Sequence, residues 1–138
     1  MLDFTWAGWP SSAGCSRDEL LAIWREITWA LRAGQPDTLV YEIADGVVQR
    51  ETRMLLEDPL VRESVDAVTY AAPDSLSCES GVRMLRGMGY TVLATAGPVA
   101  NSPLGRAEVE AMTQLPCLCG EQILGGALVP ALDAVKAA

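Results

Sequence analysis

The sequence predicts one α/β domain built as three layers, with a mainly parallel sheet flanked by helices. Short apolar segments rich in strand-forming residues alternate with amphipathic segments of helical periodicity, which is the pattern of βαβ units. The strand-like segments are nearly continuous hydrophobic runs, as expected when helices cover both faces of a parallel sheet. A chain of 138 residues, half of them hydrophobic, can bury a core, and we expect a single domain over residues 1–138.

The first half of the chain begins with a predicted short strand at residues 1–5, followed by a loop rich in Gly, Pro and Ser. Ser16 and Glu19 form a capping box, which predicts the start of a long helix because each side chain can bind the other's free backbone amide. Apolar side chains follow at helical spacing until Gly34 and Pro36 end the helix. Three further elements are expected here: a strand at 38–43, a helical turn at 51–57 and a short helix at 60–65.

The second half continues the alternation. Strands are expected at residues 66–72 and 90–96, and the helix between them is capped by Asp74 or Ser75 and ended by Gly89. The remaining expected elements are a loop at 97–103, a helix at 104–113, a short strand at 116–119 and a terminal helix from Pro130. The strands expected to lie parallel in one sheet are 38–43, 66–72 and 90–95.

Charge and composition exclude several classes of partner. The net charge is −8 with a pI near 4.4, and the ten basic residues form no cluster, so we expect no nucleic-acid partner. No apolar run approaches the ~20 residues that span a bilayer, so we expect no membrane partner. The N-terminus lacks the basic and apolar regions of a signal peptide. We therefore expect a cytoplasmic protein whose four cysteines are mostly buried and reduced.

Two carboxylates, Glu42 and Asp45, form the first candidate site. In parallel α/β sheets ligands bind beyond the carboxyl ends of the strands, and Glu42 lies at the end of the apolar strand expected at 38–43. An unpaired charge in such a strand would be costly, whereas two carboxylates suit Mg²⁺ held partly through water. The alternative is structural: Glu42 pairs with Arg50 or Arg53, or caps a neighbouring helix.

The loop that follows the strand at 90–96 forms the second candidate site. Gly97 and Pro98 have the turn chemistry of a binding loop. Asn101 offers both a donor and an acceptor, which suits reading the edge of a nucleotide base. The alternative is that Asn101 only shapes a turn or caps the helix expected at 104–113.

Several catalytic motifs are absent from the sequence. The chain has no histidine to activate a serine or cysteine, and it has no G-x-S-x-G elbow. It contains neither a G-x-x-x-x-G-K-[ST] phosphate loop nor a G-x-G-x-x-G fingerprint. The catalytic residues therefore stay unknown.

The order of these segments resembles the dethiobiotin-synthetase-like superfamily of P-loop NTPases over nearly all 138 residues. Residues 37–46 are similar to the Val-Glu-Gly-Ala-Gly-Gly element of dethiobiotin synthetase, and residues 92–101 to its strand and adenine-contacting asparagine loop. Residues 115–121 resemble its later Pro-x-Leu-Gly-Glu turn. The runs at 42–52 and 3–8 resemble uncharacterised P-loop proteins related to that family.

The resemblance implies an incomplete P-loop NTPase-like or Rossmann-like fold with ATP and Mg²⁺ as cofactors. It implies that Glu42 is the carboxylate on the Mg²⁺ or phosphate side and that Asn101 reads adenine. Two residues depart from the family: Ile43 replaces a glycine, and Asp45 falls within a turn that is glycine-rich there. The family's Walker-type loop precedes this region, so the resemblance implies a truncated or divergent ATP-binding domain that does not hydrolyse ATP alone. Active members of the family use ATP and Mg²⁺ for ligase-like activation of a carboxyl or carbamate group.

Other function classes remain open from the sequence. The main alternative is a non-catalytic α/β interaction domain that homo-oligomerises or docks on a partner subunit, with Trp6 and Trp9 as contact residues. A weaker alternative is an enzyme that handles acyl groups or amino acids on the same fold. The ATP-binding interpretation implies a small-molecule or nucleotide ligand. The interaction-domain interpretation implies a protein partner or a second copy of the chain.

Overall fold

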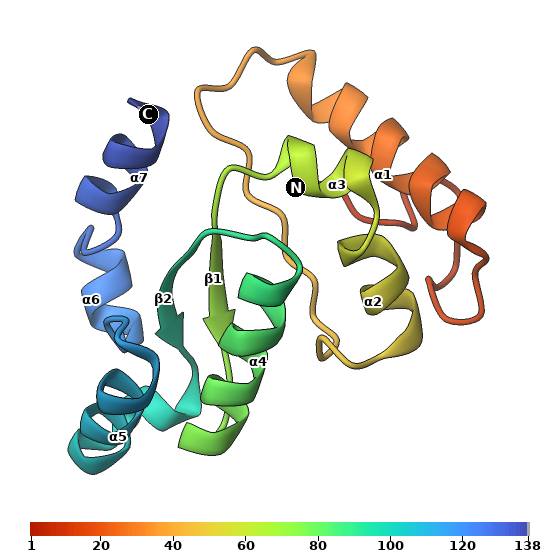
Figure 1. Ribbon diagram of the computed structural model, residues 1–138. Helices are drawn as coiled ribbons and strands as arrows, with labels where there is room; N and C mark the ends of the chain where they lie inside the picture. Colours follow the sequence, from red (N-terminus) through yellow and green to blue (C-terminus); the bar gives the residue numbers. More distant parts are fainter. Residues whose placement is uncertain (138) are drawn as a thin grey trace. The chain divides into compact units, whose positions relative to one another are not determined.

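A computed structural model describes residues 1–137 and shows a mixed α/β protein (Figure 1). The chain divides into two compact units, Met1–Val61 and Arg62–Ala138, and the single domain expected over 1–138 stays a prediction. The elements in chain order are α1 (Arg17–Arg32), α2 (Arg50–Leu56), α3 (Pro59–Ser64), β1 (Val68–Ala71), α4 (Ser75–Gly87), β2 (Val92–Ala96), the 3-10 helix η1 (Pro98–Asn101), α5 (Pro103–Thr113), α6 (Gly120–Leu124) and α7 (Val129–Lys136).

Helix α1 begins where the capping box predicts. The Ser16 side chain accepts from the Glu19 amide at 3.3 Å, and Glu19 accepts from the Ser16 amide at 2.7 Å. The Ser16 amide, followed by its hydroxyl, lowers the pKa of Glu19. The expected apolar stripe is Leu20, Ile23, Trp24, Ile27 and Leu31: its first three residues are buried, as is the neighbouring Leu21, whereas Ile27 and Leu31 are half-buried. The start, end and buried face of this helix are therefore local properties of the sequence.

The strand predicted at residues 38–43 is wrong, because this segment is irregular in the structure. Tyr41 stacks on Trp24 with ring centroids 4.3 Å apart, and its hydroxyl donates to the Thr28 hydroxyl at 2.9 Å. Strand propensity becomes a strand only where a neighbouring strand supplies hydrogen bonds, and the first unit has no strand in residues 1–61. Side-chain docking on α1 fixes the segment instead, and it leaves Glu42 exposed rather than in a buried strand.

The strand predicted at residues 1–5 is also wrong. Asp3 accepts from the Thr5 amide at 2.9 Å and from the Trp6 amide at 3.3 Å, which closes a turn. The Thr5 hydroxyl donates to the same oxygen at 2.5 Å and is the largest cause that lowers the pKa of Asp3. These side-chain hydrogen bonds stabilise a turn at residues 3–6 in place of the extended backbone of a strand.

Two buried carboxylates hold the first unit together. Glu51 in α2 accepts from the Gly14 amide at 2.8 Å and from Arg50 at 3.0 Å. The Gly14 amide is the largest cause that lowers the pKa of Glu51. Asp58, just before α3, pairs with Arg17 at the start of α1. Both carboxylates are engaged within the unit, so they serve packing rather than ligand binding.

The second unit contains the parallel pair that the sequence predicts. Strands β1 and β2 are adjacent and parallel, which confirms the parallel pairing expected between 66–72 and 90–96. Val68 lies opposite Val92, and Ala71 lies opposite Ala96. Helix α4 connects the strands and runs alongside them (Figure 1). The three-layer architecture with a larger sheet stays a prediction, since the sheet in residues 1–137 has two strands.

Helix α4 packs closely on the sheet and on α5. The Tyr70 ring lies over Gly81, where an added Cβ would be 2.1 Å from a ring carbon. Farther along α4, Arg86 donates to the Thr113 carbonyl at 3.1 Å and so binds the end of α5. These contacts anchor the two helices that frame the loops after β1 and β2.

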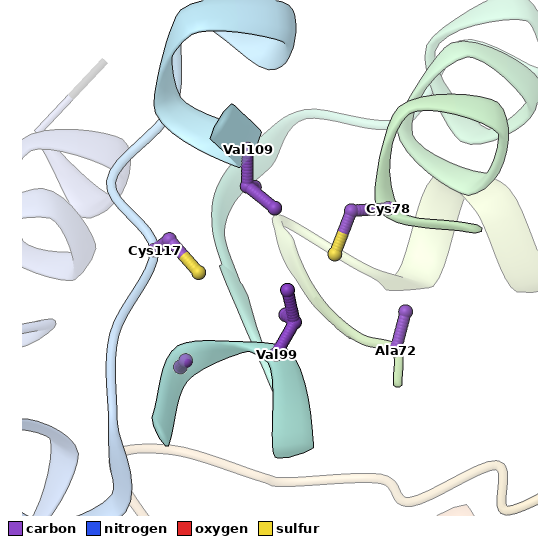
Figure 2. Packing of buried hydrophobic residues seen from close by; sticks show 6 residues of the cluster. Ala72, Cys78, Val99, Val109 and Cys117 are labelled. Atoms are coloured by element: carbon purple, nitrogen blue, oxygen red, sulfur yellow. The ribbon is translucent and has the colours of Figure 1, made fainter. Parts of the chain in front are cut away.

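A small core of buried side chains joins the sheet to α4 and α5 (Figure 2). The sulfur atoms of Cys78 and Cys117 both point into this cluster (Figure 2). Burial raises the pKa of Cys78 to about 11, with smaller contributions from Cys117 and Asp74. The Cys78 thiol is therefore protonated and packs as a small apolar group. The full cluster is Ala72, Cys78, Val99, Ala100, Val109 and Cys117.

The strand predicted at residues 116–119 is reduced to a single parallel bridge between Thr95 and Cys117. The Thr95 amide donates to the Pro116 carbonyl, and the Leu118 amide donates to the Thr95 carbonyl, both at 2.9 Å. Pro116 has no N–H, and α6 begins at Gly120, so the pairing cannot lengthen in either direction.

Among residues 1–137, no helix is long and apolar enough to cross a membrane.

Candidate functional site

The candidate site lies at the carboxyl end of β2, where a glycine turns the chain. Gly97 has φ +102°, and a Cβ there would lie 2.5 Å from the Ala72 carbonyl oxygen. The Ala72 amide donates to the Ala96 carbonyl at 3.0 Å, so the loops after the two strands are joined. Only glycine permits this backbone conformation and this close approach.

The next residues form the first wall of the site. Pro98 starts η1, and Asn101 ends it with an exposed side chain. The Ser102 hydroxyl then caps α5 by accepting from the Gly105 amide at 3.3 Å. The early turns of α5 bring Arg106 to the same place as Asn101, where both line one pocket. The loop and the helix after it therefore act as one structural piece.

The second wall follows the bridge between Thr95 and Cys117. Because this segment runs parallel to β2, its carboxyl end lies at the same edge of the sheet as the Asn101 loop. The Cys119 amide donates to the Gln122 side chain at 3.0 Å at the start of α6. The two walls enclose an open pocket of about 480 Å³, here named the Asn101 pocket, lined by Ala100, Asn101, Arg106, Cys119, Gly120 and Glu121.

Three side chains of the Asn101 pocket have unused hydrogen-bonding capacity. The side chains of Asn101, Arg106 and Glu121 make no hydrogen bond or ion pair with any other residue in 1–137. Arg106 is a donor only, an ionised Glu121 is an acceptor only, and Asn101 is both. A volume of 480 Å³ is within the range of sites for small organic ligands. The pocket can thus hold a polar ligand that presents both donors and acceptors.

The sequence-predicted residues of the second candidate site have different roles in the structure. Asn101 lines the pocket. Gly97 and Pro98 do not line it: Gly97 packs against Ala72, and the exposed Pro98 begins η1. Gly97 and Pro98 therefore shape the loop that carries Asn101, and their role as binding residues stays a prediction.

The predicted metal residues Glu42 and Asp45 belong to the first unit and are exposed. The expectation that Glu42 pairs with Arg50 or Arg53 is wrong: Arg50 pairs with Glu51, and Arg53 pairs with Glu57 at 2.7 Å. Within residues 1–137, no group of three or more Cys, Asp or Glu is arranged to hold a metal ion. Two exposed carboxylates fit only an ion that keeps most of its water, as Mg²⁺ does.

Arg106 and Cys119 were not identified from the sequence as pocket residues. Arg106 follows Asn101 by five positions in a helix that starts directly after the loop, and this spacing was the available signal. From the sequence, Cys119 is expected only as the last residue of the short strand at 116–119, with no role in a site. Its place in the pocket depends on the single bridge of Cys117 to β2, which no local pattern predicts.

A second pocket, of about 210 Å³, lies between α4 and α5. Its charged groups are already engaged, since Arg83 pairs with Glu79 at 3.5 Å and Arg86 donates to the Thr113 carbonyl. The Asn101 pocket is therefore the better candidate site.

A scan against protein-family models, a search of curated proteins and a search of solved structures each returned no match.

Proposed function

We propose that this chain is a nucleotide-binding α/β domain that holds the base of a purine nucleotide in the Asn101 pocket. The observation that carries the proposal is the convergence of three unpartnered polar side chains, Asn101, Arg106 and Glu121, on one pocket. The pocket lies beyond the carboxyl end of a parallel strand, where ligands bind in open α/β sheets. Surface residues without a binding role have no reason to gather at this edge of the sheet.

The finer assignment follows the resemblance to the dethiobiotin-synthetase-like superfamily. In this proposal the unit belongs to a three-layer, P-loop NTPase-like fold, and the ligand pair is a purine nucleoside triphosphate, ATP in the family it resembles, with Mg²⁺. The assignment of Glu42 and Asp45 to Mg²⁺ rests on the sequence and the resemblance, and two exposed carboxylates suit an ion held largely through water. The sequence has no phosphate loop, whose amides and lysine supply most of the grip on phosphates in P-loop proteins. The chain alone therefore binds ATP weakly and does not hydrolyse it.

Titration with Mg-ATP tests the proposed function. We expect saturable but weak binding in isothermal titration calorimetry, with a modest rise in melting temperature, because a ligand that binds only the folded state stabilises it by RT ln(1 + [L]/Kd). Asn101→Ala and Arg106→Ala should each weaken the binding several-fold. Arg83→Ala, which removes an exposed arginine of α4, is the matched control and should change nothing.

The absence of saturable binding for every nucleotide would contradict the proposal. A rise of several degrees in melting temperature with Mg-ATP would contradict only the weak affinity. That result would mean that a strong site exists without the phosphate loop. Both outcomes are read against the melting temperature of each variant without ligand, which shows whether the variant still folds.

A second candidate function is protein association, and exposed aromatic surface in the first unit favours it. Trp29 is 74% exposed on the side of α1 that also carries the exposed Arg25, Glu26 and Arg32. Val40 is 86% exposed on the segment that follows α1. Tryptophan on a charged face is typical of residues that become buried in an interface.

Sedimentation velocity tests this second function. We expect the chain to associate at high protein concentration and Trp29→Ser to shift it toward monomer, because the substitution removes a large exposed aromatic side chain that an interface would bury. Leu76→Ser is the control, since Leu76 is 70% exposed but lies in the second unit. A monomer at all concentrations, or an equal shift in both variants, would count against a specific interface through Trp29.

A further inference from the structure

The charges of the Asn101 pocket distinguish between ligands more sharply than its volume does. One cation, Arg106, and one anion, Glu121, line the pocket, so its formal side-chain charge sums to zero. A pocket for phosphate groups would need an excess of positive charge. The residues instead suit a neutral, planar group with donors on one edge and acceptors on another.

Guanine and adenine present different patterns to such residues. On its Watson–Crick edge guanine has two adjacent donors, N1–H and the N2 amine, and it has two adjacent acceptors, O6 and N7. Adenine has one amine, N6, flanked by the acceptors N1 and N7. A carboxylate can pair with both guanine donors at once, whereas next to adenine one of its oxygens would face the N1 acceptor. A guanidinium matches O6 and N7 of guanine with two parallel hydrogen bonds.

We propose that the Asn101 pocket selects guanine over adenine, with Glu121 accepting from N1–H and the N2 amine and Arg106 donating to O6 and N7. This inference rests on the proposed function, because it requires that a nucleotide base enters the pocket. It departs from the adenine specificity that the resemblance implies for Asn101. Asn101 keeps a supporting role as an amide that can donate or accept at the edge of the base.

The two charged residues are free to take these roles. Neither Arg106 nor Glu121 pairs with another residue in 1–137, so binding breaks no existing ion pair. Arg106 is half-buried, which reduces competition from water around its guanidinium. Glu121 is exposed near the start of α6, so a ligand in the pocket can reach its carboxyl group. The pocket thus offers a donor and an acceptor that are both charged.

Calorimetric titration with GMP, IMP and AMP, on the whole chain, tests the proposal. GMP should bind more tightly than AMP by on the order of tenfold, because one bidentate pair discriminates by about that factor. IMP lacks the N2 amine and should bind between the two. Glu121→Gln should remove most of the preference for GMP over IMP, and Arg106→Gln should weaken GMP and IMP alike. Glu79→Gln, an acidic residue of α4 outside the pocket, is the matched control.

The outcomes separate this inference from the proposed function. Tighter binding of AMP than of GMP, or an unchanged preference in Glu121→Gln, would overturn the guanine assignment while nucleotide binding stands. No binding of GMP, IMP or AMP would overturn the guanine assignment, and no binding of Mg-ATP as well would overturn both. Binding of a free amino acid in place of nucleotides would also overturn both, since a zwitterion could pair its carboxylate with Arg106 and its ammonium with Glu121. Each variant's melting curve is recorded, and Arg106→Gln provides an independent test if Glu121→Gln does not fold.

Discussion

Gly97→Ala is expected to destabilise the second unit by about 3 kcal/mol or more, the sum of backbone strain and overpacking. The new Cβ would lie 2.5 Å from the Ala72 carbonyl oxygen and 2.7 Å from the Ala72 amide nitrogen. Both atoms belong to the backbone at the hydrogen-bonded ends of β1 and β2, so neither can move without disrupting the sheet. The positive φ of Gly97 adds strain for any other residue.

Urea denaturation followed by two signals measures this effect. All four tryptophans lie in Met1–Val61, so their fluorescence reports on the first unit, whereas far-UV circular dichroism reports on both. Gly87→Ala is the control, because Gly87 ends α4 with open space around its Cα and no positive φ. The control should change the free energy of unfolding by less than about 1 kcal/mol. Wild-type stability in Gly97→Ala would show that the close packing on Ala72 is wrong.

Gly81→Ala is the second substitution with a large expected effect. A Cβ at this position would be 2.1 Å from a carbon of the Tyr70 ring, so the ring must leave its place between β1 and α4. We expect a loss of about 1–3 kcal/mol in the free energy of unfolding, as for other overpacked cores. The measurement is again urea denaturation followed by circular dichroism.

A double-mutant cycle with Tyr70→Ala identifies the cause. Without the Tyr70 ring the Cβ has room, and alanine is a better helix former than glycine. Gly81→Ala should therefore become neutral or stabilising in the Tyr70→Ala background, so the two effects should be strongly non-additive. Additive effects would mean that the clash with the ring does not cause the destabilisation.

The parts of the fold that the sequence predicts correctly depend on neighbouring residues. The capping box at Ser16 and Glu19 starts α1 because its hydrogen bonds span three positions. Asp74 starts α4 in the same way, by accepting from the Ser77 amide at 2.8 Å. Strands β1 and β2 are predicted because α4, between them, is long enough for a parallel crossover. In each case the cause lies within one element or its direct connection.

The incorrect predictions depend on partners that are distant in the sequence. Residues 38–43 have strand propensity, but the partner they find is Trp24 of α1 rather than another strand. The sequence could place Asn101 beyond the end of a strand, where it lines the candidate pocket, because that strand pairs as expected. Arg106 and Glu121 could not be brought together by pattern alone, since their meeting requires the bridge between Thr95 and Cys117.

The same bridge is the only strand-like pairing, within residues 1–137, between one wall of the pocket and the sheet. Thr95 is fully buried and supplies both backbone hydrogen bonds that attach this wall, and its hydroxyl adds a third to the Pro116 carbonyl at 3.3 Å. The segment is also held from α5, because the Cys117 amide donates to the Glu110 side chain at 3.1 Å and Cys117 is buried in the core cluster. Even so, two backbone hydrogen bonds are fewer than a paired strand would make, and stability is not uniform across a fold. A ligand in contact with Cys119 and Glu121 would therefore stabilise the attachment of this wall, so its affinity would be coupled to the local stability of that segment.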